Sequence, residues 1–279
     1  MNKRVIAIHL PQFHPFLEND EWWGKGFTEW TNVTKAKPRF LGHYQPHLPS
    51  DTGFYDLRLP EAREMQANMA REYGIYGFCY YHYWFNGKRL MDRPVKEILA
   101  SGQPDFPFML CWANENWSRN WDGKFRNILI EQHYSEEDDI EHMRYLCSKV
   151  FQDTRYIRID GKPVFAIYRS NFFPNMKHTI DVWRKVAKEE YGIELYLIRV
   201  ENEPDFGPKY LDCGFDSAMD FQPLLMGEFN AWWKNLPFRI MNHLFKGKYQ
   251  WFNKHFSYAS YVKYLSLIHI SEPTRPISI

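Results

Sequence analysis

Short apolar segments alternate with amphipathic segments along most of this chain. The apolar runs have the length and the β-branched or aromatic content of buried strands, and the segments between them carry apolar residues at helical spacing. Helices are predicted at 60–73, 93–101, 136–150 and 178–190. Strands are predicted at 4–10, 75–84, 106–112, 163–168, 194–200 and 217–221, the fourth as the second arm of a hairpin that turns at Asp160-Gly161. This alternation of strand and helix indicates parallel βαβ units.

Two architectures fit this order: an open doubly wound sheet and a (β/α)₈ barrel. The glycine-rich turns of dinucleotide- and phosphate-binding folds are absent from the sequence, and polar and aromatic residues follow nearly every strand instead. This favours the barrel, in which several strand ends build one site. About six core strands precede residue 225, whereas a barrel has eight. We therefore expect an α/β fold of the (β/α)₈ TIM-like type that is incomplete.

The segment from Gln12 to about Tyr55 is rich in proline and shows no clear period, so it is predicted to be mostly loop. A loop of this length in a compact domain is usually functional.

Charge and hydropathy exclude some classes of function. Lys and Arg number 35 and Asp and Glu number 34, which leaves no basic surplus for a phosphate backbone, so no nucleic-acid partner is expected. No apolar run approaches the length of a membrane span, and the run behind the first residues is too short for a signal peptide. We therefore expect a cytoplasmic protein without a membrane span.

Aromatic residues make up 18% of the sequence, and many stand beside polar residues. Aromatic rings stack on the CH faces of sugars while amides and carboxylates bond to their hydroxyl groups. A large aromatic core would give the same composition.

Motifs for cofactors and metals are missing. None of the four cysteines forms a CxxC pair, and Cys79 and Cys111 lie in apolar runs typical of buried thiols. The sequence has neither a His-Glu-x-x-His nor a Gly-x-Ser-x-Gly motif, so no metal and no cofactor is expected. Arg199, Glu201 and Glu203 follow the fifth strand and are candidates to line the site, although a surface ion-pair cluster is the favoured interpretation.

The first segment with candidate chemistry runs from residue 10 to residue 30. Glu29 lies between aromatic residues, where burial would raise its pKa, or it fixes the loop by hydrogen bonds; the two interpretations are about equal. His14 is a candidate donor to a sugar hydroxyl, although a structural histidine is the more common case. Gln12 and Trp30 complete this group of candidates.

The second and third segments belong to predicted strands. Alternate residues of a barrel strand face the axis, so either Tyr81 and Tyr83 or their neighbours, which include Trp84, point inward. The run 110–118 ends a strand with an Asn-Glu-Asn sequence between two tryptophans. A carboxylate with amides at the carboxyl end of a barrel strand suits a sugar. For Asn114, Glu115 and Trp117 we therefore favour a functional over a structural role.

These segments resemble a known family. The stretches 7–15 and 19–33, with the runs 76–85 and 111–117, resemble the WbsX proteins, also described as glycoside hydrolase family 99-like domain proteins. The resemblance covers about residues 4–264. It implies a (β/α)₈ barrel that acts in the biosynthesis of bacterial surface polysaccharides such as O-antigen or capsule. Members are called glycosyltransferases, although the fold resembles that of endo-mannosidases.

The resemblance also implies where catalysis occurs. Members carry a later Asn-Ala-Trp-Asn-Glu-Trp-x-Glu-Gly segment, whose two carboxylates match the catalytic pair of the hydrolases. In those hydrolases the 2-hydroxyl of the sugar is the nucleophile, deprotonated by one carboxylate. This sequence lacks the segment, and residues 227–233 echo it in a different context that does not carry the role.

The last residues of the chain look foreign to the domain. Residues 265–279 resemble translated sequencing-adapter read-through, with a genuine polar tail as the alternative. We therefore expect a truncated domain at 1–264, a non-native tail at 265–279, a catalytic pair beyond the chain end and an inactive chain.

The sequence thus predicts a domain of an enzyme that makes or breaks glycosidic bonds, with a glycan or sugar as its partner. Glu115 and Glu29 are candidate assisting acids. The predicted substrate-binding residues are Gln12, His14, Trp30, Tyr81, Tyr83, Trp84, Asn114, Glu115 and Trp117. The alternative is a glycan-binding module without catalysis. A metal-dependent nucleotide-sugar transferase would require an Asp-x-Asp motif, which is absent.

Overall fold

The computed structural model describes residues 4–38, 43–119, 124–201 and 209–221, and the single positions 237, 240 and 244. The chain divides into two compact units. The first consists of Met1–Asn32, Pro49–Asp220 and Ser278–Ile279, and the second of Val33–Leu48 and Phe221–Ile277. All the strands described below belong to the first unit.

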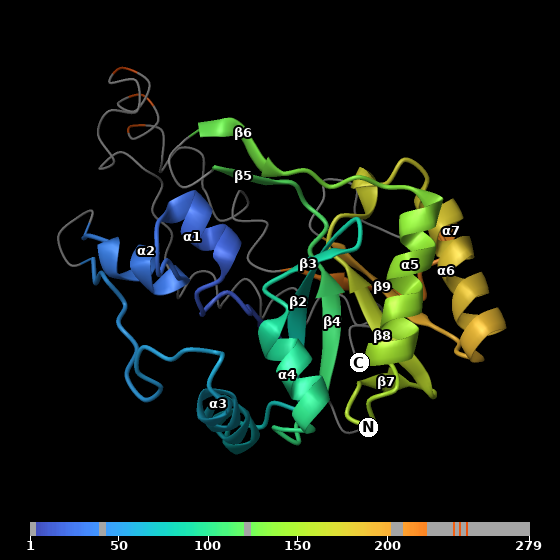
Figure 1. Cartoon of the computed structure of the whole chain (residues 1–279), viewed down its shortest axis with the longest axis horizontal. Helices are drawn as coiled ribbons and strands as arrows, with labels where there is room; N and C mark the ends of the chain where they lie inside the picture. Colours follow the sequence, from blue (N-terminus) through green and yellow to red (C-terminus); the bar gives the residue numbers. More distant parts are fainter. Residues whose placement is uncertain are drawn as a thin grey trace. The chain divides into compact units, whose positions relative to one another are not determined.

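Six parallel strands form the main path of the sheet in the order β1-β2-β4-β8-β9-β10 (Figure 1). Their bounds are β1 (Ile6–His9), β2 (Gly77–Phe85), β4 (Phe108–Trp112), β8 (Lys162–Ile167), β9 (Tyr196–Glu201) and β10 (Ser217–Asp220). Two short strands pair antiparallel with this path: β3 (Lys88–Leu90) with β2, and β7 (Arg158–Ile159) with β8. A separate hairpin consists of β5 (Trp117–Arg119) and β6 (Lys124–Ile130).

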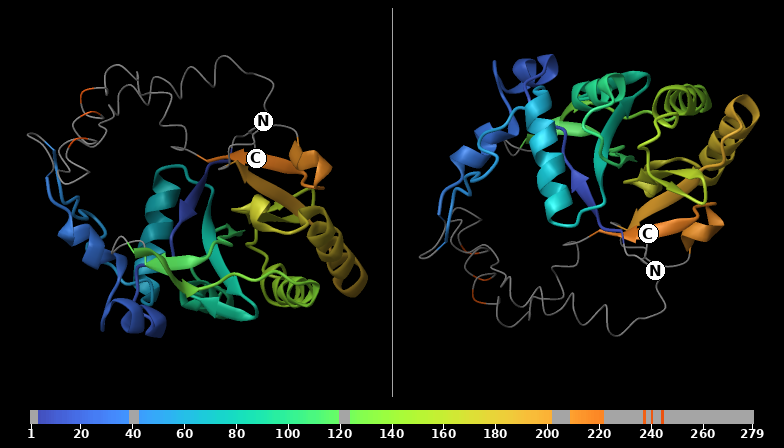
Figure 2. Two further views of the ribbon diagram at one scale, coloured as in Figure 1. Left: turned by 90° about the horizontal axis from the view of Figure 1, so that it is seen from above. Right: turned by 90° about the horizontal axis from the view of Figure 1, so that it is seen from below.

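The order of the strands decides between the two architectures that the sequence left open. Each parallel strand lies beside the one that precedes it in the chain, with no point at which the order reverses. A doubly wound sheet requires such a reversal, whereas a barrel grows by one neighbour at a time. Figure 2 shows the strands following an arc rather than a flat sheet. The prediction of an incomplete (β/α)₈ barrel is confirmed.

Helices lie between the parallel strands, four of them on the segments that the sequence pattern predicted. They are α1 (Leu17–Trp23), α2 (Glu29–Lys35), α3 (Pro60–Glu72), α4 (Arg93–Ser101), α5 (Glu136–Tyr145), α6 (Met176–Tyr191) and α7 (Lys209–Asp212). One π-helical turn (Leu146–Val150) continues α5, and a 3₁₀ turn (Ser170–Phe172) precedes α6. Side-chain oxygens of Ser135 and Asn175 accept from backbone N–H groups in the first turns of α5 and α6, which satisfies donors that have no partner inside a helix.

The two faces of the sheet have different roles. Toward α5 and α6 the strands pack a fully buried aromatic core, which includes Trp112, Phe165 and Trp183. Alternation along β2 places Tyr81 and Tyr83 on the opposite face, and this resolves which of the β2 side chains point inward.

The segment 12–55 is mostly loop in the described residues, as predicted, but it also contains the two short helices α1 and α2, which the sequence did not predict. These helices have seven residues each, too few for a clear period, and α1 has no side-chain cap. The β5–β6 hairpin was not expected. Arg199 and Glu201 form a buried rather than a surface ion pair, with an Nη2 to Oε1 distance of 2.8 Å.

Some predictions concern other parts of the chain. Glu203, the echo at 227–233 and the tail at 265–279 lie outside the described residues. Within the described residues, no helix combines the length and the apolar character needed to cross a membrane.

Candidate functional site

A cavity of about 510 Å³ lies at the carboxyl ends of the first strands. Residues after β1 and β4 and in the second half of β2 form most of its wall, with further side chains from α1, β6 and the end of β8. The lining residues are Leu10, Gln12, Asn19, Trp23, Phe27, Glu29, Tyr81, Tyr83, Met91, Ala113, Glu115, Asn116, Trp117, Ser118, Leu129 and Tyr168. Strand ends converge here for the reason that they do in other barrels: parallel strands all finish at one rim.

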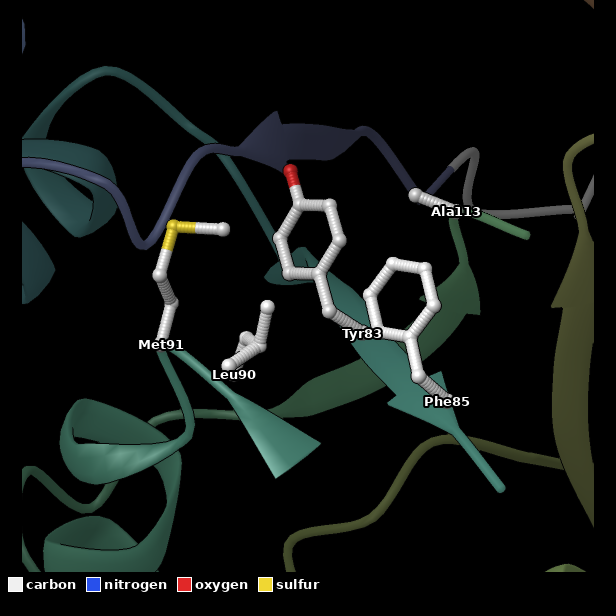
Figure 3. Packing of buried hydrophobic residues seen from close by; sticks show 5 residues of the cluster. All are labelled: Tyr83, Phe85, Leu90, Met91 and Ala113. Carbon is white, nitrogen blue, oxygen red and sulfur yellow. The ribbon is translucent and has the colours of Figure 1, made fainter. Parts of the chain in front are cut away.

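Tyr83 stands at the centre of this wall. Its hydroxyl oxygen accepts a hydrogen bond of 2.8 Å from Nε2 of Gln12. In Figure 3 the ring rises from β2 beside Phe85, with Leu90 and Met91 opposite. Burial raises the pKa of Tyr83, and the carboxylates of Glu29 and Glu115 raise it further. The phenol therefore keeps its proton, and because its oxygen already accepts from Gln12, that proton is directed to another acceptor.

Glu29 enters the cavity from the first turn of α2. Its side chain is half-buried, and burial raises its pKa. A carboxyl group with a raised pKa is suited to carry a proton for a leaving oxygen or to receive one from a hydroxyl. A hydrogen bond with Asn32 acts against the rise in the pKa of Glu29. The side chain thus both lines the cavity and bonds within its own segment, and the two interpretations of Glu29 stay predictions.

Glu115 comes directly after β4 and is held by an ion pair. Its Oε1 lies 2.7 Å from Nε of Arg169, and its side chain keeps 38% of its surface exposed. The guanidinium of Arg169 also lies over the rings of Tyr168 and Phe172. The carboxylate thus has a fixed partner on one side and the cavity on the other.

Asn114 does not line the cavity, although it was predicted to bind substrate. Its side chain is fully buried. Its Nδ2 donates to the hydroxyl of Tyr134 and to the carbonyl of Arg169, and its Oδ1 accepts from the N–H of Arg169, all at 2.9 Å. Asn114 therefore joins the end of β4 to the end of β8 and fixes the backbone on both sides of the Glu115–Arg169 pair.

Three further predicted residues also lie away from the cavity. Trp30 donates from Nε1 to the carbonyl of Tyr55 at 2.8 Å and packs in the loop. Trp84 faces the helices, where it stacks on a histidine of α5. His14 is buried and lines a separate cavity. The cavity brings together Gln12, Glu29, Tyr81, Tyr83, Glu115 and Trp117.

Several lining residues were missed by the sequence analysis. Tyr168 directly follows β8, and Asn116 lies in the segment between β4 and β5, so the rule that barrel sites form at strand ends would have found both. Asn19 and Trp23 are four residues apart on α1 and share one face of it, which the prediction of a loop concealed.

Among the described residues, no group of three or more His, Cys, Asp or Glu side chains is placed to hold a metal ion. The chemistry available in the cavity is that of two carboxylates, amides, a tyrosine hydroxyl and aromatic faces.

The sheet is parallel and of barrel type, and the cavity at its strand ends is lined by aromatic rings and carboxylates. This combination is common among carbohydrate-active proteins. The model of the family described as "Glycosyltransferase WbsX" matches residues 5–275. The chain belongs to this family.

The chain is 42% identical over 219 residues to an uncharacterized protein, WxcX, of Xanthomonas campestris pv. campestris strain B100, and equally to its counterpart in strain ATCC 33913. The match covers 78% of this chain and 31% of each relative, so the chain spans about a third of the length of the curated relatives it matches.

Solved structures share the fold. The GH99 endo-alpha-mannosidase from Bacteroides thetaiotaomicron, in complex with BIS-TRIS-propane, superposes with a TM-score of 0.51 at 13% identity, over 88% of this chain and 67% of its own. A glycoside hydrolase-like protein also gives a TM-score of 0.51, at 17% identity, over 79% of this chain and 58% of its own. At these identities the likeness concerns the fold.

Proposed function

We propose that this domain binds a glycan in the cavity at the ends of β1, β2 and β4, as part of an enzyme that makes or breaks glycosidic bonds in a bacterial surface polysaccharide. The observation that carries the proposal is the composition of the cavity wall. Five Trp and Tyr rings, three side-chain amides and two carboxylates surround one space. Rings stack on sugar CH faces, and amides and carboxylates bond to hydroxyl groups.

The proposal has a second part, which is a role of the domain in the biosynthesis of a surface polysaccharide. It is supported by the family's description as glycosyltransferases and by the N-terminal motifs that resemble WbsX proteins. The reaction, its donor and its acceptor are properties of the whole protein. The predicted cytoplasmic location stays a prediction.

The two carboxylates suit different tasks in such a reaction. Glu29, whose pKa is raised by burial, is the candidate proton donor or acceptor. Glu115, paired with Arg169, is the better hydrogen-bond acceptor for a sugar hydroxyl.

A glycan array probed with the purified chain tests the binding step. We expect binding to a limited set of glycans, and we expect Trp23→Ala to weaken it by about tenfold, since loss of one stacking ring removes on the order of 1 kcal/mol. Tyr73→Ala is the matched control, because Tyr73 is exposed and lies outside this cavity. Absence of glycan binding, or equal binding by both variants, would contradict the proposal.

Turnover separates the enzyme from the alternative, a binding module without catalysis. The assay measures release of reducing ends and transfer of a labelled sugar for a longer family member that contains this domain. Glycan binding without either reaction in that protein would favour the binding module.

A further inference from the structure

The charge of the cavity wall is one-sided. Two carboxylates, those of Glu29 and Glu115, line it, and none of its lining residues in the described part of the chain is a lysine, an arginine or a histidine. A ligand group placed here meets negative charge and aromatic rings.

The two carboxylates line the same cavity as the Tyr83 ring. The charge of each also raises the pKa of Tyr83. Arg169 offsets part of the charge of Glu115 but is not among the residues of the cavity wall.

The rings add to this preference. The π faces of Trp23, Trp117 and the three lining tyrosines attract a cation, and the attraction is larger where water is partly excluded. Aromatic faces beside carboxylates are the chemistry that recognises an ammonium group. A carboxylate or phosphate would instead lose its hydration beside two like charges, with no described cation in the wall to compensate.

The neighbouring cavity shows that this is not a property of the whole rim. That cavity is lined by Lys25, Arg58, Arg89 and Arg93 together with acidic residues, and of the two sets of lining residues only Met91 is common to both. The neighbouring cavity thus has side chains of both charges, whereas the cavity that contains Glu29 and Glu115 has only negative ones among its described lining residues. Any preference for a ligand charge that follows from this difference belongs to the Glu29–Glu115 cavity alone.

We propose that the sugar held in the Glu29–Glu115 cavity carries a protonated amino group and that the cavity discriminates against acidic sugars. The proposal rests on the proposed function, since it names the class of sugar that the glycan site accepts. An ammonium group near Tyr83 would interact with both carboxylates while the sugar ring stacks on the aromatic wall.

Matched sugars that differ only in charge test the proposal. The probes are the methyl glycosides of an amino hexose, the neutral hexose and the hexuronate, each in the gluco, galacto and manno configurations, with affinities measured by saturation-transfer NMR and calorimetry on the full chain. Within the best-binding configuration we expect the amine to bind about tenfold more tightly than the neutral sugar and the uronate to bind least. Raising NaCl from ~0.05 M to ~0.5 M should reduce the advantage of the amine, because screened charges interact more weakly.

Variants assign the preference to the two carboxylates. Glu29→Gln and Glu115→Gln keep the size of the side chain and should each reduce the ratio of amine to neutral affinity several-fold. A hydrogen bond that either carboxylate makes to a sugar hydroxyl is weakened for both sugars and so cancels in this ratio. Glu64→Gln is the matched control, because Glu64 is an exposed carboxylate of α3 outside the cavity. Thermal melting verifies that each variant is folded.

The outcomes separate the inference from the function on which it rests. Uronate binding equal to or tighter than amine binding, equal affinity for the amine and the neutral hexose, or a ratio that neither Gln variant alters would each overturn the inference alone. If none of the nine sugars binds, the inference is wrong. If, in addition, no glycan binds on the array, the proposed function is wrong as well.

Discussion

The side-chain amide of Gln12 and the hydroxyl of Tyr83 are joined by a hydrogen bond of 2.8 Å across 71 residues of sequence. Gln12 follows the first strand of the sheet and Tyr83 belongs to the second, so the bond ties two strand ends together at the wall of the cavity. It also orients the phenol, since the oxygen that accepts from the amide must send its own proton elsewhere.

Tyr83→Phe removes this hydroxyl and keeps the ring. We expect glycan affinity to fall several-fold, because one donor to the ligand is lost, and the free energy of unfolding to fall by only about 1 kcal/mol, since one hydrogen bond is lost. Calorimetric titration and urea denaturation measure the two effects.

Tyr156→Phe is the matched control for that change. The Tyr156 hydroxyl is buried, donates to the carbonyl of Val164 at 2.8 Å and accepts from the N–H of Leu110 at 3.2 Å, away from the cavity. We expect it to lower stability at least as much as Tyr83→Phe and to leave affinity unchanged. Equal affinities for the two variants would show that the Tyr83 hydroxyl has no part in binding.

Asn114 tests how the end of β4 is held. In Asn114→Ala the three hydrogen bonds that this side chain makes to the Tyr134 hydroxyl and to the backbone of Arg169 disappear, so we expect the free energy of unfolding to fall by about 3 kcal/mol. Glycan affinity should fall as well, through the loosened Glu115–Arg169 pair. Asn68→Ala, at an exposed position of α3, should change stability by less than about 0.5 kcal/mol. A stable Asn114→Ala variant would refute the positioning role.

Trp84 packs toward α5 whereas Trp117, in the β5–β6 hairpin, lines the cavity, so their variants should separate stability from binding. Trp84 donates to Asp138 at 2.9 Å and stacks on His142, so Trp84→Phe should destabilise the fold by about 1–3 kcal/mol without altering glycan affinity. Trp117→Ala removes a ring of the cavity wall and should weaken affinity by about tenfold. Weaker binding by Trp84→Phe at unchanged stability would restore Trp84 as a binding residue.

The sequence predicts the barrel strands well because their apolar runs are long and their flanks carry Pro, Gly and polar residues. It fails for α1 and α2, where seven residues span only two turns and a periodic pattern cannot stand out. It also fails for the β5–β6 hairpin, whose pairing contains register shifts and so leaves no regular alternation in the sequence.

Within the candidate site the sequence predicts which types of residue are present better than it predicts the direction in which each side chain points. The Asn-Glu-Asn run after β4 was recognised, yet only the structure shows that Asn114 turns into the protein while Glu115 lies at the cavity. Trp30 and Trp84 were selected for their aromatic and polar neighbours, which are equally typical of a packed core. Direction depends on contacts with distant segments, such as that between Trp30 and Tyr55, and a local pattern does not contain it.

A histidine pair in the core predicts acid sensitivity. The Nε2 atoms of His82 and His142 lie 2.9 Å apart, so one ring donates to the other and both are neutral. Burial lowers the pKa of His82 to about 3 and also lowers that of His142. The positive charge of Arg89 also lowers the pKa of His82. The nearby carboxylate of Asp138 accepts a hydrogen bond from Nε1 of Trp84.

The direction of the effect follows from these shifts. Because the folded pKa values lie below the unfolded value of about 6.5, the pair contributes stability that is fully present above pH 6.5 and is lost as the pH falls toward 3. Asp139 acts in the opposite sense, since burial raises its pKa to about 6 and its protonation below that pH favours the folded state. Burial also raises the pKa of Glu29 and Asp138, which act with Asp139, and lowers the pKa of His9 and His14, which act with the pair. Four histidines against three carboxyls leave a net loss of stability on acidification.

We therefore expect the free energy of unfolding, measured by urea denaturation from pH 7.5 to pH 4.5, to fall with a slope of up to about 1.4 kcal/mol per pH unit for each buried histidine. His82→Gln should retain a hydrogen bond to His142 and reduce this slope by removing one titrating group. His133→Gln is the control, because His133 is exposed beside Glu131, and its slope should match that of the unaltered chain. If His82→Gln and His133→Gln gave the same slope, the acid sensitivity would have its origin outside the histidine pair.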